Sequence, residues 1–250
     1  MPVNIDVIII SYAKTDELKA ITLNCVESLL ASEKPENIVF DALVIESNKE
    51  MIPYQYPGAK TIYPDTAFGY NKYLNIGINM TSNPYLCLCN NDLVFHPGWA
   101  TEILKAFAQQ PSIASANPYS ENFDYDTRIK NGDNVIRRDN TLYMDGVLTG
   151  WCIFVKREIF RKTGLLDEQF TFWYADNDYD QMLRKHGIRH ALVKSSLVTH
   201  LFCKSHDLLH DKKEELTTGQ KAIFEKKWHK KSLLVSMLRR IKNSFGTTNQ

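Results

Sequence analysis

Residues 85–92 read Tyr85-Leu86-Cys87-Leu88-Cys89-Asn90-Asn91-Asp92, an apolar run that ends abruptly in two amides and one carboxylate. The run predicts a strand buried inside a sheet, and ligands of open α/β sheets bind beyond the carboxyl ends of such strands. Amide and carboxylate oxygens suit Mg²⁺ or Mn²⁺ carrying a diphosphate. The same residue types are common in turns and at helix starts, so this stretch alone does not separate a metal site from a turn.

Strands and helices alternate around this stretch. Val7-Ile8-Ile9-Ile10 is a continuous β-branched run, as expected for a strand buried on both faces of a parallel sheet. Apolar residues fall on one stripe in three further segments, which predicts helices there. In chain order, we expect a helix at residues 18–30, strands at 40–45 and 61–63, and helices at 70–78 and 99–107. This order predicts an α/β fold with a mostly parallel central sheet flanked by helices.

The chain changes character at residues 119–143, which are rich in Asn, Asp, Arg and Gly. Apolar periodicity disappears there, so we expect a mobile loop rather than core. Regular structure is expected again after this loop. The expected elements are a strand at residues 147–155, a helix at 157–162 closed by Gly164, a helix around 179–183, and short strands at 191–193 and 197–199.

Composition limits the classes of partner. The 30 basic and 29 acidic side chains of the 250 residues give a formal net charge of +1, so no nucleic-acid partner is expected. The five cysteines form no C-x-x-C pair and lie mostly in apolar runs, which favours buried thiols in a reducing compartment. The N-terminus has no signal-peptide pattern, and no apolar stretch reaches the ~18 residues of a membrane span. We therefore expect a cytoplasmic protein.

An acidic cluster precedes the predicted helix around residues 179–183. Asp176, Asp178 and Asp180 are spaced two residues apart, shortly after the aromatic pair Trp173-Tyr174. Acidic residues at a helix start ordinarily cap the helix and favour its dipole, which accounts for one or two of them. A carboxylate that aromatic rings partly desolvate can also act as a general base toward a hydroxyl nucleophile. His200 follows the last predicted strand, and such a histidine alone is more often structural than a ligand.

The sequence resembles the family 2 glycosyltransferases of the GT-A fold, from about Val7 to His200. Residues 164–170, Gly-Leu-Leu-Asp-Glu-Gln-Phe, are similar to the family's Gly-Gly-Phe-Asp-Glu-x-Phe element, and residues 176–180 are similar to its Glu-Asp-x-Asp segment. Seven segments match in the family's order, which is far more specific than any one motif. They are residues 7–12, 44–47, 68–77, 85–99, 148–157, 164–170 and 176–180.

The resemblance implies an inverting enzyme that moves a sugar from a UDP- or dTDP-sugar to a hydroxyl of a glycan or lipid-linked acceptor. The chain also resembles bacterial rhamnosyl- and galactofuranosyltransferase-like members of the family. Asp92 and His200 are implied as metal ligands, and an imidazole favours Mn²⁺ over Mg²⁺. Asp176 is implied as the base, with Asp178 as the alternative. The residues implied for nucleotide-sugar binding are Ser11, Tyr12, Glu46, Asn71, Asn90, Asn91 and Trp151.

Two positions depart from the family's pattern. Asn90 stands where the usual Asp-x-Asp metal motif begins, and one charge fewer predicts weaker metal affinity. The acidic run has no Glu-Asp pair, so the base stays open between Asp176 and Asp178. An inactive GT-A domain that only binds nucleotide or glycan is one alternative. A sugar nucleotidyltransferase is another, although residues 11–15 contain no glycine for a phosphate loop.

The resemblance also divides the chain into a domain and a tail. We expect one GT-A domain at residues 1–205, followed by a basic helical C-terminal tail at residues 206–250. Within the domain, residues 1–118 would bind the nucleotide and residues 144–205 would face the acceptor. Residues 119–143 would form a lid that orders over the donor and excludes water.

The tail combines basic residues at 226–231 with an apolar stripe between residues 233 and 241. Such a segment can lie on an anionic membrane surface at the inner face of the membrane, which would suit a lipid-linked acceptor. It can also be a helix that packs on the domain or on a second subunit. The sequence leaves both alternatives open.

Overall fold

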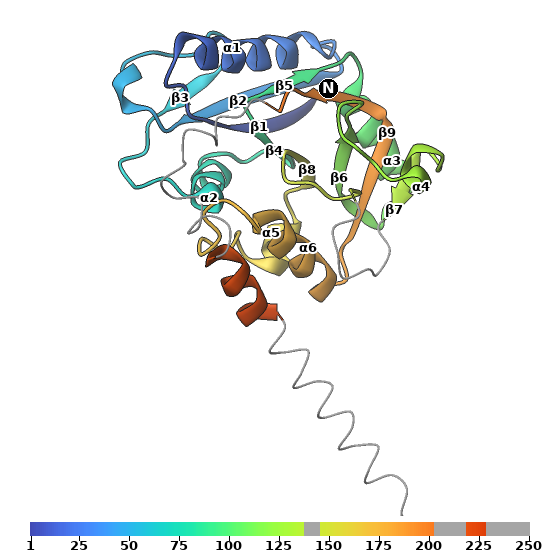
Figure 1. The fold of residues 1–250 in the computed structure, drawn as a ribbon. Coiled ribbons are helices and arrows are strands. Elements are labelled where there is room, and N and C mark those ends of the chain that lie inside the picture. The colour runs from blue at the N-terminus through green and yellow to red at the C-terminus, as the bar shows by residue number, and fades with distance from the viewer. Residues whose placement is uncertain (138–145, 203–218, 229–250) are drawn as a thin grey trace, which may run out of the picture.

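The computed structural model describes residues 1–137, 146–202 and 219–228. Its described strands form one nine-stranded sheet in the order β3-β2-β1-β4-β8-β6-β9-β5, and β7 also pairs with β9 (Figure 1). The strands are β1 (Val3–Ser11), β2 (Ile38–Glu46), β3 (Lys60–Ile62), β4 (Tyr85–Asn90), β5 (Leu93–Phe95), β6 (Ile113–Tyr119), β7 (Val135–Arg137), β8 (Cys152–Lys156) and β9 (Arg189–His200). The helices are α1 (Asp16–Ala31), α2 (Tyr70–Met80), α3 (Trp99–Gln109), α4 (Thr127–Lys130), α5 (Ile159–Thr163) and α6 (Ala175–Lys185), with one 3₁₀ turn, η1 (Lys49–Met51).

The first half of the sheet is parallel. β1 pairs in parallel with β2 and β4, and β2 pairs in parallel with β3. The register places Ser11 opposite Glu46, and Ile10 opposite Asn90. The carboxyl ends of β1, β2 and β4 therefore meet at one edge, where an open α/β sheet binds its ligands.

The second half of the sheet is mixed, because β8 runs antiparallel to both β4 and β6. β6 and β9 are parallel, whereas β5 and β7 are antiparallel to β9. The expectation of a mostly parallel sheet is therefore wrong for this half, because a buried apolar run does not encode the direction of its strand. The strand expected at residues 147–155 begins only at Cys152, and the two short strands expected at 191–193 and 197–199 belong to the single strand β9.

Side chains of β1 alternate between two cores, one on each face of the sheet. Ile5, Val7 and Ile9 belong to a core with residues of α1 and α3, whereas Ile8 and Ile10 belong to a core with residues of α2, α5 and α6. Figure 1 shows α1 on one side of the sheet and α2, α5 and α6 on the other. Fully burying one such side chain contributes roughly 1.5–3 kcal/mol. The predicted arrangement of a central sheet flanked by helices is confirmed.

Residues 119–137 hold more regular structure than the sequence analysis expected, because they include α4 and β7. Tyr125 and Ile129 are buried in a small core of their own, together with Leu192 of β9. Residues 138–145 lie outside the described residues. A mobile lid over the donor therefore stays a prediction.

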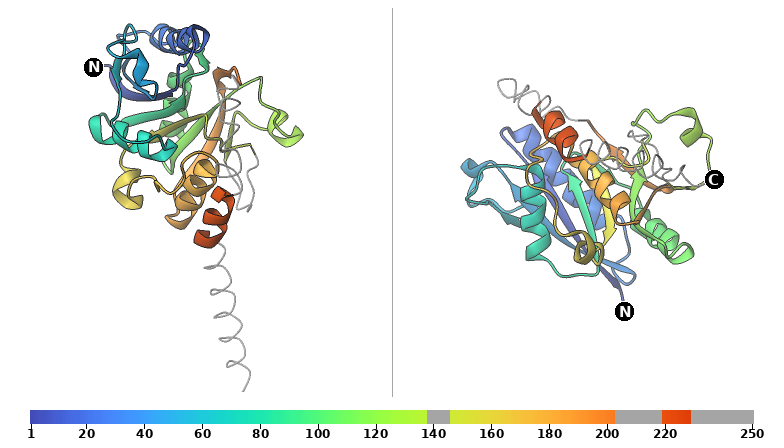
Figure 2. Two further views of the ribbon diagram at one scale, coloured as in Figure 1. Left: turned by 60° about the vertical axis from the view of Figure 1, so that its left-hand side comes forward. Right: turned by 90° about the horizontal axis from the view of Figure 1, so that it is seen from below.

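Residues 219–228 are helical, and this red segment lies beside the orange helix α6 in both views of Figure 2. Its Phe224 ring packs against Phe170 and Tyr174. The described part of the expected tail thus packs on the domain, while residues 229–250 lie outside the described residues. Within the described ranges, no helix has the length and apolar character needed to cross a membrane.

Candidate functional site

A chain of hydrogen bonds links the carboxyl ends of β2, β1 and β4. Ser11 Oγ donates to Glu46 Oε2 at 2.6 Å and lies 3.0 Å from the hydroxyl oxygen of Thr22 on α1. Asn91 Nδ2 donates to the same hydroxyl oxygen at 2.7 Å. The structure therefore brings Ser11, Glu46 and Asn91 together as predicted neighbours. Thr22 was missed, because nothing in the sequence distinguishes this threonine from others on an amphipathic helix.

Glu46 is fully buried, and protein donors surround its carboxylate. Besides Ser11, it accepts from the backbone N–H groups of Ala13 at 3.1 Å and Asn48 at 2.7 Å. Tyr56 Oη donates to it at 3.3 Å. These bonds fix the loop after β1 against the end of β2, so Glu46 shapes this edge of the sheet through the backbone.

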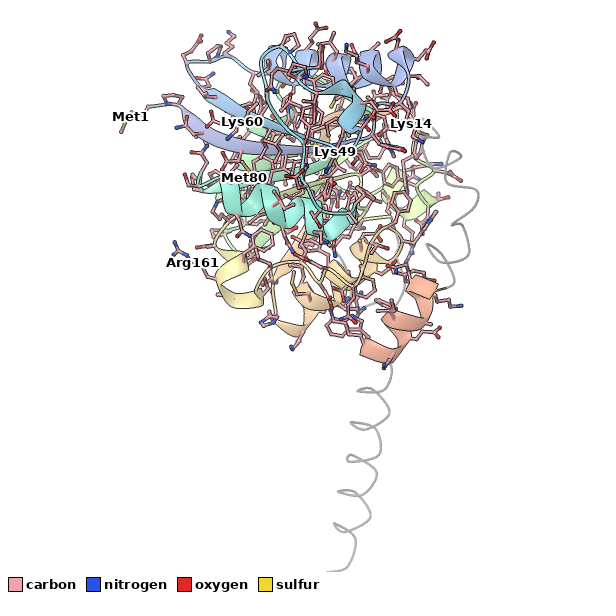
Figure 3. All side chains as sticks on the ribbon, turned by 90° about the vertical axis from the view of Figure 1, so that its left-hand side faces the viewer. Met1, Lys14, Lys49, Lys60, Met80 and Arg161 are labelled. Atoms are coloured by element: carbon pink, nitrogen blue, oxygen red, sulfur yellow. The ribbon has the colours of Figure 1, made fainter. Side chains whose placement is uncertain are left out.

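Tyr12 follows β1 at this edge and is partly buried. The ammonium of Lys14 lies 5.1 Å from the centroid of its ring, and the hydrogen bond to Tyr12 raises the pKa of Lys14. In Figure 3, Met1 and Lys14 are labelled at opposite ends of the sheet, so Lys14 marks the carboxyl edge. A cation at this edge suits an anionic ligand.

Asp92 and His200 come together because β5 pairs with β9. Leu93, directly after Asp92, lies opposite His200 in this antiparallel pair. His200 Nε2 and Asp92 Oδ1 are 3.3 Å apart, with side-chain exposures of 10% and 9%. In addition, Leu201 N donates to Asp92 O at 2.9 Å, which fixes the strand end beside the carboxylate.

Two aromatic rings contact the imidazole of His200. Trp151 stacks on it at 5.4 Å with an interplanar angle of 19°, and Phe202 lies at 4.1 Å between ring centroids. Among the residues that the structure describes, the buried Trp151 Nε1 and His200 Nδ1 atoms have no hydrogen-bond partner. Leaving a buried polar atom unpaired costs about 1–3 kcal/mol, so both atoms are suited to contact a ligand.

The donor atoms of Asp92 and His200 fit a divalent metal. Two ligand atoms that bind one ion at right angles, each at ~2.1 Å, lie about 3.0 Å apart, close to the 3.3 Å observed. A carboxylate with an imidazole suits Mn²⁺ better than Mg²⁺. Over the described ranges, no group of three or more His, Cys, Asp or Glu side chains is arranged to hold a metal. Phosphate oxygens and water commonly supply the remaining positions around such ions.

Tyr70, the first residue of α2, connects the end of β4 with the turn before β8. Its hydroxyl lies 2.9 Å from Gly150 O and 3.2 Å from Asn90 Oδ1. Burial raises the pKa of Tyr70, and neighbouring ionisable groups, Asp176 among them, raise it further. The hydroxyl therefore stays protonated and acts as a donor. In the sequence, Tyr70 stands out only as an apolar residue of a predicted helix, so this contact was missed.

Asp176 lies in the first turn of α6, directly against the same turn before β8. A Cβ added to Gly150 would lie 3.2 Å from Asp176 Cβ and 3.3 Å from Asp176 Oδ2, so a side chain there would crowd the carboxylate. The other carboxylate oxygen accepts from Asn177 N at 2.9 Å. Because Gly150 and Trp151 are adjacent, Asp176 and His200 flank one short turn.

Asp178 faces the C-terminal helix. Lys227 Nζ and Trp228 Nε1 both lie 2.7 Å from Asp178 Oδ1. Burial raises the pKa of Asp178, and the hydrogen bonds from Lys227 and Trp228 only partly oppose this effect. The two candidates for the general base therefore have different surroundings.

Asn71 also lies apart from the strand-end residues. Its Nδ2 atom donates to Asp167 O at 2.9 Å. One turn later on α2, Asn75 donates to Leu166 O at 2.8 Å and accepts from Leu166 N at 3.0 Å. Both amides are buried and clamp this loop onto α2. The roles of Asn71 and Asp178 in binding or catalysis stay predictions.

The chain matches one family model and is similar to solved structures. The model described as Glycosyl transferase family 2 matches residues 6–164. A search of curated proteins gave no match.

Two solved structures of transferases show the same fold. GalNAc-T7, solved with UDP, GalNAc and Mn²⁺, superposes with a TM-score of 0.63 at 14% identity, over 82% of this chain and 44% of that one. The catalytic domain of Drosophila beta1,4-galactosyltransferase 7, solved with xylobiose, gives 0.52 at 13% identity, over 82% and 73%. This chain therefore spans less than half of the GalNAc-T7 chain. Together with the family match, these likenesses confirm the GT-A fold.

Proposed function

Since the chain belongs to glycosyl transferase family 2, we propose that it transfers a sugar from a nucleoside-diphosphate sugar to a hydroxyl of a glycan or lipid-linked acceptor, inverting the anomeric centre. One observation carries the proposal. The Asp176 carboxylate and the Asp92–His200 pair flank the same turn at Gly150 and Trp151. A base for the acceptor and a binding point for the leaving diphosphate are thus held close to one another.

In the proposed reaction, the acceptor oxygen attacks the anomeric carbon opposite the diphosphate. The hydroxyl proton moves to the Asp176 carboxylate as the new C–O bond forms, and the bond from the anomeric carbon to the diphosphate oxygen breaks. This single displacement inverts the configuration. General-base help of this kind typically contributes about 10²- to 10⁴-fold in rate.

The donor would bind along the carboxyl edge of the sheet, with UDP- and dTDP-sugars as the expected donors. Tyr12 would contact the base, and Lys14 provides a cation beside it. Trp151 Nε1 is a buried donor that can reach a ligand oxygen. A divalent metal held by Asp92 and His200, Mn²⁺ more readily than Mg²⁺, would supply positive charge that stabilises the departing diphosphate.

The proposal is tested first by screening UDP- and dTDP-sugars with Mn²⁺ for thermal stabilisation of the chain. A ligand at 100 times its Kd adds about 2.7 kcal/mol to the free energy of unfolding. With the donor so found, Asp176→Asn should keep this stabilisation while the transfer rate falls at least ~100-fold. Asp178→Asn should lose far less activity, because its carboxylate bonds Lys227 and Trp228.

His200→Ala is the matched contrast to Asp176→Asn. It should lose the Mn²⁺-dependent part of the stabilisation together with transfer, because it removes one of two metal ligands. An active Asp176→Asn beside an inactive Asp178→Asn would show that the assigned base is wrong. If no sugar nucleotide stabilises the wild-type chain, the proposed function fails.

A further inference from the structure

One lysine joins a carboxylate of the loop before α6 to a carboxylate in the first turn of α6. Lys227 Nζ lies 2.7 Å from Asp167 Oδ2 and 2.7 Å from Asp178 Oδ1. Trp228 Nε1 donates to the same Asp178 oxygen at 2.7 Å. The side-chain exposures are 31% for Lys227, 22% for Asp167 and 6% for Asp178, so the contact on the α6 side is buried.

The same C-terminal helix holds the backbone between these two carboxylates. Gln220 Oε1 accepts from Thr171 N at 2.9 Å. The ring of Phe224 packs at 5.4 Å on Tyr174, the residue directly before α6. Tyr174 has a φ of 63°, a left-handed conformation that a non-glycine residue keeps only where its surroundings hold it.

We infer that helix 219–228 positions Asp176, and that Lys227 is the positioning residue at the centre of this contact. This inference rests on the proposed function, in which Asp176 is the base. Asp176 lies two residues after Tyr174 and two before Asp178, and both neighbours are held by the helix. The orientation of Asp176 toward Gly150 therefore depends on a contact made far along the chain.

Lys227 holds the start of α6 by its charge as well as by packing, because its ammonium lies between two carboxylates. Burial alone would raise the pKa of Asp167, but bonds from Lys227 and Gln169 outweigh it, so this pKa is lowered. The more deeply buried Asp178 keeps a raised pKa despite the same cation. Without Lys227, two carboxylates would face one another, one of them buried, and the start of α6 would move to relieve them.

The test compares Lys227→Met with Lys226→Met in the full-length chain. Lys226 is exposed on the same helix, so its substitution removes the same charge without the contact. Lys227→Met should lower kcat by roughly 10- to 100-fold, because small displacements of a reacting group cost that much. Affinity for UDP with Mn²⁺ should stay unchanged. Lys227→Arg should restore most of kcat, and adding Asp178→Asn to Lys227→Met should restore part of it by removing the buried charge.

Hydrogen exchange separates this inference from the proposed function. Lys227→Met should speed exchange in residues 171–178, where Asp178 N donates to Tyr174 O, and leave β1 unchanged. A kcat for Lys227→Met within twofold of that for Lys226→Met would overturn the inference. If the wild-type chain transfers no sugar, the proposed function fails. Hydrogen exchange still decides in that case whether Lys227 holds the start of α6. Unchanged exchange there would also overturn the inference.

Discussion

Asp176 and Asp178 lie two positions apart at the start of α6, and a helix turns about 200° over two residues, so their side chains point in different directions. Asp178 meets a lysine and a tryptophan of the C-terminal helix. Asp176 lies against Gly150, where an added Cβ would come within 3.3 Å of its carboxylate. Identical residue types thus acquire one structural and one proposed catalytic role from their neighbours, which the spacing of the acidic run cannot show.

Glu46 is a second residue whose surroundings define it. Glu46→Gln replaces one of the two acceptor oxygens with an NH2 group that cannot accept, so the bond from Ser11 Oγ or the one from Ala13 N is lost. We expect a loss of about 1–3 kcal/mol in the free energy of unfolding, measured by urea denaturation. Affinity for UDP should fall as well, since the loop that carries Tyr12 loosens.

The control for this substitution is Glu50→Gln, an exposed glutamate in η1. It changes the same charge and should shift stability by less than ~0.5 kcal/mol. Equal stabilities of the two variants would show that the buried carboxylate does not hold the loop.

For helices and strands, the hydrophobic pattern correctly predicted the features that depend on local sequence alone. The continuous apolar runs of β1 and β4 are buried on both faces, and their polar ends mark the carboxyl edge of the sheet. The direction of β8 depends on a turn that the hydrophobic pattern does not specify. β5 has only three residues, too few for a periodicity, yet its pairing with β9 is what unites Asp92 with His200.

The candidate site was predictable where its residues end a strand, as at Ser11, or closely follow one, as at Asp92. It was not predictable where a contact joins distant segments. Tyr70 reaches Gly150 across 80 residues, and Trp228 reaches Asp178 across 50. Both side chains are amphipathic, and their sequence neighbourhoods indicate ordinary helix packing. Only the folded chain identifies them as parts of the site and its support.

The contact between α2 and β1 allows a test at this level. A Cβ on Gly77 would lie 2.6 Å from Ile8 Cγ2, and Ile8 is fully buried. Overpacking lowers the free energy of unfolding by about 1–3 kcal/mol. Replacing glycine by alanine in a helix raises it by up to ~1 kcal/mol. Gly77→Ala should therefore lower the free energy of unfolding by up to ~2 kcal/mol in urea denaturation.

Gly69→Ala serves as the comparison, because a Cβ there meets its nearest atom, Lys72 Cβ, at 3.4 Å. This variant should be close to wild type. A Gly77→Ala chain as stable as Gly69→Ala would mean that α2 can move away from the sheet without cost.

Across the whole molecule, the carboxyl edge of the sheet collects the candidate site from segments that lie far apart in the chain. β1, β2 and β4 contribute their ends, β9 contributes His200 and α6 contributes Asp176. The helix at residues 219–228 belongs to this assembly, because it contacts the segment that leads into α6. The described part of the C-terminal region is therefore docked on the domain. For residues 229–250, which lie outside the described residues, the alternatives of membrane contact and packing can be tested by themselves.

A chain that ends after Trp228 suits the membrane test, because it lacks residues 229–250 and keeps Lys227 and Trp228. Ending after Glu225 would also remove Lys227 and Trp228 and leave Asp178 buried without a cation, which costs about 3–5 kcal/mol. We expect the 1–228 chain to unfold at the temperature of the full-length chain, and the 1–225 chain to unfold about 6–20 °C lower. Differential scanning calorimetry measures both shifts. An equal unfolding temperature for 1–228 and 1–225 would contradict the docked helix.

The same chains test the membrane proposal by co-sedimentation with vesicles containing anionic lipid. Residues 229–250 contain Lys230, Lys231, Arg239, Arg240 and Lys242 beside an apolar stripe. Each basic residue near such a surface contributes about 1 kcal/mol at low ionic strength, and salt screens the attraction. The full-length chain should therefore sediment with anionic vesicles but not with neutral ones, and release at high salt, while the 1–228 chain stays in solution. Binding by the 1–228 chain would place the membrane contact on the folded domain, and no binding by either chain would leave self-association or packing as the role of the tail.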